Sequence, residues 1–475
     1  MAAAAEPVAA QESPEQVVAA LLARARSAMA AYESHSQERI DEAVTALAWA
    51  IYKPENAQAL AELAVRDTGL GTVASKVVKN QRKTFGTLRD LLRVRSVGII
   101  EDDSARGLVK YAKPVGVVAA VCPSTNPAAT PVNKAMMALK GGNAVVIAPS
   151  PSAYATTART VELMRAELRK AGHPVDLVQV LPAPVSKELT QALVTGADLA
   201  VVTGSQDNVR RSMQSGTVTI GVGAGNVPVI VDLSADLDDA AEKIAASKTF
   251  DNATSCSSEN ALIVLDGVYE PMLAALERQG GYRASAEEKE SIVHKLWRAG
   301  KLNRRVIARD MAVLAEEIGL SDEARRARFV LVEDDRPGRD RPLSDEKLSL
   351  VLTVYRARDF HHAKALVRDV LEVKGKGHSC GIHTANQAQA RELAEDTDVV
   401  RVLVNQPHAF GNGGAFNNAL PFTLSMGCGT WQNNVISENL NWRNFINVTH
   451  LVTTTAEDKP SEEDLFGRYW RKYGR

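Results

Sequence analysis

A single cysteine in a polar turn is the first residue of this chain that could do covalent chemistry. Cys256 lies in FDNATSCSSEN (250–260), directly before the apolar run ALIVL. The flanking Ser and Thr residues are untypical of a core strand, and a turn of this kind leaves a thiol partly exposed. A thiolate is the reactive form, and backbone donors or a bound cation lower its pKa. A lone cysteine is more often a small core residue, so a buried thiol and a nucleophile are both open readings.

The other cysteines suggest neither a metal site nor a disulfide framework. Cys122, Cys380 and Cys428 are far from one another and from Cys256 in the chain, and no CxxC pair exists. Zinc sites usually take their cysteines in such close pairs, so we expect no metal. Reduced thiols are the default in the cytoplasm, where we expect this protein to lie.

An asparagine held between prolines is the second candidate. Asn126 lies in CPSTNPAATP (122–131), just after the apolar run VGVVAAV (115–121). Such an asparagine often supports only its own turn. The functional alternative is a side-chain amide, fixed at the carboxyl edge of a sheet, that stabilises the oxyanion formed when a thiolate attacks a carbonyl.

The strands and helices that must position these residues predict an α/β fold. Apolar runs typical of strands buried on both faces alternate with helical stretches, which predicts a doubly wound parallel sheet. Ligands of such sheets bind beyond the carboxyl ends of strands, so the turns after 121, 148 and 203 are the places to search. Strands are expected at 115–121, 143–149, 175–183, 199–205 and 227–234, and helices at 133–142, 153–172 and 187–196.

The flanking regions predict further units. Helices are expected over 13–65, followed by an irregular, basic stretch to about Arg95. Residues 98–113 read as a polar hairpin, and a second α/β pattern, with a helical stretch to about Gly319, begins near Asp236. In NFINVTHLVTTT (444–455), polar and apolar residues alternate, as in an edge strand. The tail is a short amphipathic segment rich in aromatic residues.

Composition and length narrow the class of protein. The 475 residues exceed what one hydrophobic core usually organises, so two or more lobes are expected. A formal net charge of −1 gives no electrostatic case for nucleic acid or an anionic membrane, and no apolar run is long enough to span a bilayer. The start, MAAAAEPVAAQESPEQ, lacks the pattern of a secretory signal and reads as a short disordered leader.

Taken together, these motifs resemble the aldehyde dehydrogenase superfamily, and within it the acylating, coenzyme A-dependent branch. The likeness rests on Cys256, the P-x-x-N-P loop, and a set of further segments in consistent order from about residue 15 to 455. These segments are GNAVVIAPSPSA, VVTGSQ, FDN before the cysteine, EKLSLVLTVYRA (346–357), GKGHS (375–379) and LSMGCGTW…SEN (424–439).

The resemblance implies a fold. It predicts a Rossmann-type nucleotide-binding lobe at 1–97 and 114–234 and an α/β catalytic lobe at 235–444. A small bridging β-sheet would come from 98–113 and 445–456, followed by a C-terminal tail at 457–475. In the family the bridging sheet joins subunits, so a homodimer or homotetramer is implied.

The resemblance also assigns roles, residue by residue. Cys256 would be the nucleophile and Asn126 the oxyanion donor. Glu346 would hold the nicotinamide ribose of NAD or NADP, although in the run SDEK alone it reads as a solvated charge. Gly204 and Ser205 would form the turn near the pyrophosphate, where a helix N-terminus favours negative charge. His378, in GKGHS, would lie near the active site, with a structural histidine as the alternative.

One departure from the family pattern concerns water. Hydrolytic aldehyde dehydrogenases carry a glutamate, as general base, where this chain has Gly221 in GVGAGNVPVIV. Water, with a pKa near 16, needs such a base, whose help is worth about 10²–10⁴-fold. A thiol, with a pKa of about 8.5, needs no such base, because part of it is already ionised at neutral pH. The missing base therefore favours coenzyme A over water as acyl acceptor. The glycines of GVGAG precede a strand, so they are not a dinucleotide loop.

A second departure concerns the nucleotide. Relatives often place a lysine and then a glutamate after the strand equivalent to NAVVI, against the adenosine ribose. Here the segment is APSPSA, with Pro149 and Ser150 and no acid before Glu162. An acid would repel a 2′-phosphate, so its absence leaves NADP open beside NAD, with Ser150 and Ser152 as hydroxyl donors.

The substrate is the least determined feature. Within the acylating branch, GGAFNNALPFTLSMGCGTW and PSEEDLFGRYWRKYG (460–474) most resemble members that act on sulfoacetaldehyde, although no arginine stands out as a sulfonate ligand. Acetaldehyde, propionaldehyde and succinate semialdehyde stay open. A hydrolytic dehydrogenase with another base and a non-catalytic scaffold are the competing hypotheses; the presence of Cys256, Asn126 and Glu346 disfavours the scaffold.

Overall fold

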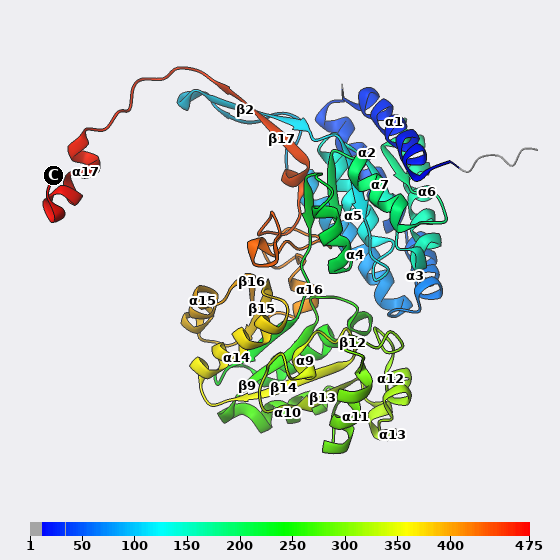
Figure 1. The fold of residues 1–475 in the computed structure, drawn as a ribbon, viewed down its shortest axis with the longest axis vertical. Helices are drawn as coiled ribbons and strands as arrows, with labels where there is room; N and C mark the ends of the chain where they lie inside the picture. Colours follow the sequence, from blue (N-terminus) through cyan, green and yellow to red (C-terminus); the bar gives the residue numbers. More distant parts are fainter. Residues whose placement is uncertain (1–11, 34) are drawn as a thin grey trace, which may run out of the picture.

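The computed structural model describes residues 12–33 and 35–475, folded as two α/β lobes and a projecting β-arm (Figure 1). Most of the leader expected before Ser13 therefore lies outside the described residues. Two large sheets, of five and seven strands, form the centres of the lobes, and a three-stranded sheet forms the arm. The α/β fold class predicted from the sequence is confirmed.

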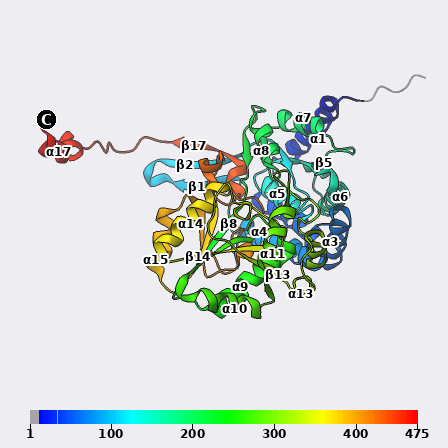
Figure 2. The same ribbon diagram turned by 60° about the horizontal axis from the view of Figure 1, so that its bottom comes forward.

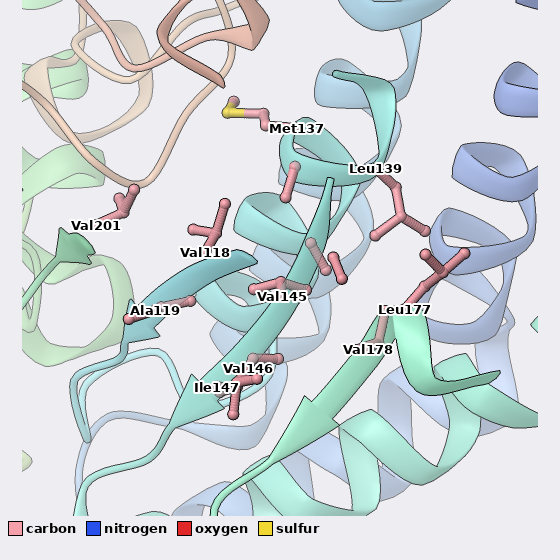
Figure 3. Close-up of a cluster of buried hydrophobic side chains, with 14 of the residues drawn as sticks. Val118, Ala119, Met137, Leu139, Val145, Val146, Ile147, Leu177, Val178 and Val201 are labelled. Atoms are coloured by element: carbon pink, nitrogen blue, oxygen red, sulfur yellow. The ribbon is translucent and has the colours of Figure 1, made fainter. Parts of the chain in front are cut away.

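The first lobe is built on a five-stranded parallel sheet in the order β5-β4-β3-β6-β7. Its strands are short and buried, as the apolar runs predict. Figure 3 shows Val118, Val146 and Val178 on three neighbouring strands beneath Met137 and Leu139. The strands are β3 (Val117–Val121), β4 (Ala144–Ala148), β5 (Val178–Val180), β6 (Leu199–Val202) and β7 (Thr219–Gly221).

Helices cover both faces of this sheet. Several begin with a serine or threonine whose side chain accepts a backbone N–H, as Ser13 does in a complete capping box. The helices are α1 (Pro14–Tyr32), α2 (Gln37–Tyr52), α3 (Pro54–Thr68), α4 (Val73–Leu92), α5 (Ala129–Lys140), α6 (Tyr154–Lys170), α7 (Lys187–Gly196) and α8 (Gln206–Met213).

The second lobe is built on a seven-stranded sheet in the order β10-β13-β14-β9-β8-β15-β16. Its strands all run parallel. They are β8 (Val227–Val231), β9 (Glu259–Leu265), β10 (Gly281–Arg283), β13 (Phe329–Glu333), β14 (Val351–Ala357), β15 (Gly377–His383) and β16 (Val399–Val404). The helices are α9 (Leu237–Thr249), α10 (Tyr269–Arg278), α11 (Ala286–Leu296), α12 (Met311–Ile318), α13 (Asp322–Arg326), α14 (Phe360–Val373), α15 (Gln387–Asp396) and α16 (His408–Gly411).

Three expectations need correction. Strand β8 lies within the range 114–234 expected for the first lobe, yet it pairs with β9 and β15 in the second sheet, because the chain crosses between lobes after β7. The basic stretch read as irregular is α4, a helix whose buried face carries lysines instead of apolar residues. The helical stretch expected up to Gly319 also contains β10 and the small hairpin β11 (Trp297–Arg298) and β12 (Lys301–Leu302).

The predicted bridging sheet is present. The hairpin of β1 (Gly98–Asp103) and β2 (Leu108–Pro114) is extended by the antiparallel strand β17 (Ile446–Val452). This arm leads into an extended segment that ends in α17 (Glu462–Tyr473), and both views show α17 away from the body of the molecule (Figures 1 and 2). No helix within 12–33 and 35–475 is long and apolar enough to cross a membrane.

Candidate active site

The site lies between opposite edges of the two large sheets. In the first sheet, Val121 pairs in register with Ala148 and with Val202, so the turns that follow these three strand ends lie side by side. In the second sheet, the functional candidates precede their strands: Cys256 comes before β9 and Glu346 before β14. The carboxyl edge of one sheet thus faces the amino edge of the other.

One pocket joins contributions from both lobes. Asn126 of the first lobe and Ser255 and Ser257, the neighbours of Cys256, line it together. Its enclosed cavity is small, about 30 Å³, within about 480 Å³ of space that includes open solvent. The remaining wall comes from α4 and from the segment after α16, with the lining residues Val78, Lys79, Arg82, Lys83, Phe250, Ala409, Phe410, Gly413, Thr423, Leu424 and Met426.

The turn that presents Cys256 has an unusual backbone. Asp251, Asn252 and Ala253 have φ angles of 52°, 53° and 58°, three successive left-handed residues without a glycine. Each such residue costs of order 1–3 kcal/mol, so surrounding contacts must enforce the conformation. Clustering of this strain next to a nucleophile is typical of a functional turn.

A buried ion cluster holds this turn. The Asp251 carboxylate accepts hydrogen bonds from Lys76 Nζ at 3.1 Å and Lys79 Nζ at 2.6 Å, and all three side chains are almost inaccessible to solvent. It also accepts the Thr254 hydroxyl at 2.7 Å. The two lysines lower the pKa of Asp251 against the effect of burial. Since Lys76 also donates to the Thr125 carbonyl, α4 connects the cysteine turn to the asparagine loop.

The Cys256 thiol is in a secluded position. Burial, followed by the Glu346 carboxylate and Cys428, raises its pKa to about 12, while the Arg401 guanidinium lowers it. The glycine segment before β8 runs directly against this residue: a Cβ at Gly225 would lie 2.0 Å from the Cys256 carbonyl oxygen. At Gly225, the segment before β8 thus packs its backbone against that of the cysteine.

The Asn126 amide is free to bind a ligand. Its Nδ2 makes only a long hydrogen bond of 3.5 Å to the Thr125 hydroxyl, and its Oδ1 is buried without a partner. A polar group in such a state is costly unless something else satisfies it. The Nδ2 protons, held only by this long bond, suit the predicted donation to an oxyanion in this pocket, whereas Oδ1 is an acceptor and cannot bind one.

Glu346 lies near the Cys256 thiol but does not line this pocket. Burial raises the pKa of its carboxyl group to about 7, opposed mainly by Lys374 at 4.0 Å. No hydrogen-bond donor to this carboxylate occurs in the described part of the chain. It can thus accept hydrogen bonds from a bound diol.

Comparisons with known proteins agree with this arrangement. Residues 4–281 match the model of the aldehyde dehydrogenase family. The chain is 50% identical, over 99% of its length and 95% of the relative's, to a sulfoacetaldehyde dehydrogenase (acylating) of Cupriavidus necator. A second such enzyme, from Bilophila wadsworthia, is 43% identical over 95% of this chain and 98% of its own.

The chain belongs to the aldehyde dehydrogenase family. Its structure also superposes on the crystal structure of an acetylating aldehyde dehydrogenase from Geobacillus thermoglucosidasius, with a TM-score of 0.90 and 33% identity over 94% of this chain and 98% of that one. The likeness to the acylating branch inferred from the sequence is confirmed.

The residues at the carboxyl edge suit the dinucleotide of an aldehyde dehydrogenase. Ser205 caps α8, and the space at Gly204 is open, since a Cβ there would meet only Asn208 Nδ2 at 3.7 Å. Ser150, after the buried Pro149, places its hydroxyl 3.3 Å from that of Ser152. Together with the unpaired Glu346 carboxylate, these groups fit NAD or NADP. Their roles stay predictions.

The hydrolytic base of the family has no counterpart at Gly221. A Cβ there would lie 2.5 Å from Val209 Cγ1 and 3.1 Å from Met213 Cε, so the position faces the first-lobe helix α8. The packing around β7 leaves no room for a carboxylate. The carboxylate that acts most strongly on Cys256 is instead Glu346.

His378 lies in the core behind the site. It is fully buried on β15, its Nδ1 lies 2.8 Å from the Ser379 hydroxyl, and it does not line the pocket. Burial, with Arg401 and His408, lowers its pKa well below the ordinary value. Its carbonyl oxygen accepts a hydrogen bond from Arg401 at 2.9 Å. Any part of His378 in cofactor binding therefore stays a prediction.

The sequence reasoning missed two groups. Arg401 is a buried cation that donates to Asn439 Oδ1 at 2.9 Å and Gly427 O at 2.7 Å, and its charge lowers the pKa of Cys256. The second group is the basic face of α4, including Lys76 and Lys79. The sequence does contain a signal for these lysines. They are spaced three and four residues apart, as on one face of a helix, in a stretch that lacks an apolar stripe.

Proposed function

We propose that this protein oxidises sulfoacetaldehyde to its coenzyme A thioester with NAD or NADP, in a reversible reaction. The observation that supports the reaction type is that Asn126 and the two neighbours of Cys256, Ser255 and Ser257, line one pocket, while the packing at Gly221 leaves no room for a base. The substrate is supported by the acylating sulfoacetaldehyde dehydrogenases that share up to half of their residues with this chain.

The first half-reaction forms a thioester on the enzyme. The Cys256 thiol first loses its proton to water, against the raised pKa that burial gives it, and the thiolate then attacks the aldehyde carbon. A C–S bond forms, and the carbonyl oxygen becomes an oxyanion that the Asn126 amide stabilises. NAD(P)⁺, when bound, accepts the hydride from this carbon. Loss of the hydride restores the carbonyl, and an acyl group remains on the Cys256 sulfur.

The second half-reaction passes the acyl group to a thiol. The thiolate of coenzyme A attacks the thioester carbon, Asn126 again holds the oxyanion, and the Cys256 sulfur leaves. No proton needs to be taken from a weak acid, because a thiol with a pKa of about 8.5 is already partly ionised. Arg401 favours the departing Cys256 thiolate, because its charge lowers the pKa of that thiol.

The test is the dependence of the reaction on coenzyme A. NAD(P)H formation from sulfoacetaldehyde should continue past one turnover only with coenzyme A present, and the product should be an acyl thioester. Undiminished multiple turnover without coenzyme A, with free acid as product, would favour a hydrolytic dehydrogenase. Acetaldehyde, propionaldehyde and succinate semialdehyde, run in parallel, identify the preferred substrate.

We further propose that the protein acts in the cytoplasm as a homodimer or homotetramer. All four cysteines are unpaired, in keeping with a reducing compartment. The arm projects from the body and exposes Val448, Leu451 and Val452 on β17. Light scattering coupled to gel filtration would measure the state of assembly, and a monomer at micromolar concentration would contradict the proposal.

A further inference from the structure

The wall of the pocket formed by α4 is strongly basic. Lys79, Arg82 and Lys83 all line it, opposite Asn126 and Ser257. Three cationic residues on one wall of a small pocket are unusual for an enzyme that accepts a neutral aldehyde, because buried charge is costly unless it is paired. Whether each of these cations has a carboxylate partner therefore decides whether it can bind an anionic ligand.

The three cations differ in their partners. Lys79 is paired with the Asp251 carboxylate at 2.6 Å. Arg82 and Lys83 have no carboxylate within 4 Å in the described part of the chain. The one carboxylate of α4, Asp90, is paired with Arg89 at 2.7 Å.

Arg82 and Lys83 are held only by neutral groups. The Arg82 guanidinium makes two long hydrogen bonds of 3.4 Å to the Phe410 carbonyl and lies over the rings of Phe410 and Phe422. Lys83 is 7% exposed, and its ammonium donates to the Gly413 carbonyl at 2.6 Å. Burial, then Arg82 and Lys79, lowers the pKa of Lys83 to about 7, as expected where positive charge is in excess.

We propose that Arg82, assisted by Lys83, forms a subsite for the sulfonate group of the substrate. The inference rests on the proposed function and extends it to the residues that select the substrate. A sulfonate is fully ionised and offers three acceptor oxygens, which match the planar fork of a guanidinium and the point charge of an ammonium. With the aldehyde carbon at Cys256 and Asn126, the rest of the substrate extends along α4 toward these cations.

The subsite gives selectivity as well as affinity. A neutral aldehyde of the same length leaves both cations unpaired in the pocket, and unpaired buried groups are a strong source of discrimination. Carboxylate-bearing aldehydes can also pair with Arg82. Succinate semialdehyde, however, places its charge one carbon farther from the reacting carbon than sulfoacetaldehyde does, so it tests the reach of the subsite.

The first experiment compares substrates across variants. With coenzyme A and nucleotide saturating, Arg82→Gln should lower the ratio of kcat/KM for sulfoacetaldehyde to that for acetaldehyde by roughly 10- to 100-fold, the effect of losing a charge-assisted hydrogen bond. Most of the change should appear in KM. Lys83→Met should lower the same ratio, and Arg82→Lys should recover part of it.

Arg89→Gln is the matched control. Arg89 also lies on α4 and over the rings of Phe416 and Phe422, but it is paired with Asp90 and does not line the pocket. The ratio should be unchanged in this variant. If Arg82→Gln lowers kcat/KM for both aldehydes equally, Arg82 only packs the aromatic cluster, and the subsite is overturned.

A binding measurement separates this proposal from the substrate assignment. Isethionate, 2-hydroxyethanesulfonate, carries the sulfonate but no aldehyde, and calorimetry reports its binding without turnover. Wild-type protein should bind it, and Arg82→Gln should bind it roughly 10-fold or more weakly. If isethionate binds in this way while sulfoacetaldehyde is not oxidised, the proposed substrate fails and the sulfonate subsite stands. If wild-type protein does not bind isethionate, the subsite is wrong even where sulfoacetaldehyde is oxidised.

Discussion

The two sheets contribute opposite edges to the site, and the edges differ in physical character. At the carboxyl edge of the first sheet, Gly204, Ser205 and Ser150 are partly or fully exposed and offer backbone and hydroxyl donors. At the amino edge of the second sheet, Cys256 lies beside left-handed backbone and a buried ion cluster centred on Asp251. The first edge suits a ligand that binds and dissociates, and the second fixes the cysteine that we propose as the nucleophile.

Each edge also contributes one residue to the function expected of the other edge. Asn126 belongs to the exposed carboxyl edge but points its amide into the reaction pocket. Glu346 belongs to the buried amino edge but is the residue expected to hold the nucleotide ribose. The two lobes must therefore be aligned for either binding or chemistry to occur, which the following four predictions test.

Cys256→Ala should have the largest effect. It removes the nucleophile of the amino edge, so coenzyme A-dependent NAD(P)H formation should fall by at least about 10⁴-fold. Nucleotide binding, followed by NAD(P)H fluorescence, should persist because the carboxyl edge is untouched. Cys428→Ala is the matched control, a nearby cysteine outside the pocket, and should keep most of the activity; the reverse result would place the nucleophile at Cys428.

Asp251→Asn should cost about 3–5 kcal/mol of unfolding free energy, as breaking one partner of a buried ion pair usually does. Lys76 and Lys79 would lose their shared counter-ion. Urea unfolding measures the change. Asp340→Asn, which breaks an exposed pair with Arg336, should leave the unfolding free energy nearly unchanged, because such pairs are screened by solvent. Equal costs in the two variants would contradict the role of the buried cluster.

Asn126→Ala should lower kcat by about 10²–10³-fold, the usual effect of removing one oxyanion donor. KM for the aldehyde and the affinity for nucleotide should change much less, because Asn126 acts on charge that develops during the reaction. Steady-state kinetics and nucleotide titration check both. A loss seen mainly in nucleotide affinity would instead place Asn126 with the binding residues of its own edge.

Glu346 should make nucleotide affinity depend on pH, with the smallest effect of the four. Its pKa is raised to about 7, so the carboxylate is ionised above this pH and accepts hydrogen bonds, whereas below it the group is protonated. The Kd for NAD(P)H should therefore rise as the pH falls from 8 to 6. Glu346→Gln should bind roughly 10-fold more weakly with little dependence on pH. Equal pH dependence in the variant would show that a group other than Glu346 titrates.

Much of this arrangement could be predicted from the sequence where local pattern and tertiary structure agree. The buried strands β3, β4 and β6 are continuous apolar runs, so the turns after them, with Asn126 and Gly204, were placed correctly on one edge. Cys256 was found because its polar turn contrasts with the apolar strand that follows. These signals are local, and no alternative fold overrides them.

The remaining features could not be predicted, because they depend on contacts between segments that are far apart in the sequence. Strand β8 looks like the next strand of the first sheet, and only its pairing with β9 and β15 assigns it to the second. Helix α4 was missed because its buried face is basic, and that face makes sense only opposite Asp251. Arg401 could not be singled out either, since its partners are the carbonyls and amide of remote loops.

The Asp251 cluster also bears on whether each lobe can fold without the other. Lys76 and Lys79 belong to the first lobe, but their only counter-ion in the described chain comes after β8, in the second. During synthesis, the strands and helices of the first sheet all precede residue 251, and until that residue emerges Lys76 and Lys79 must stay hydrated without their counter-ion. The proposed nucleophile and the counter-ion of these two lysines are delivered by the same short segment, so exchanging one lobe for that of another protein would separate the lysines from their partner.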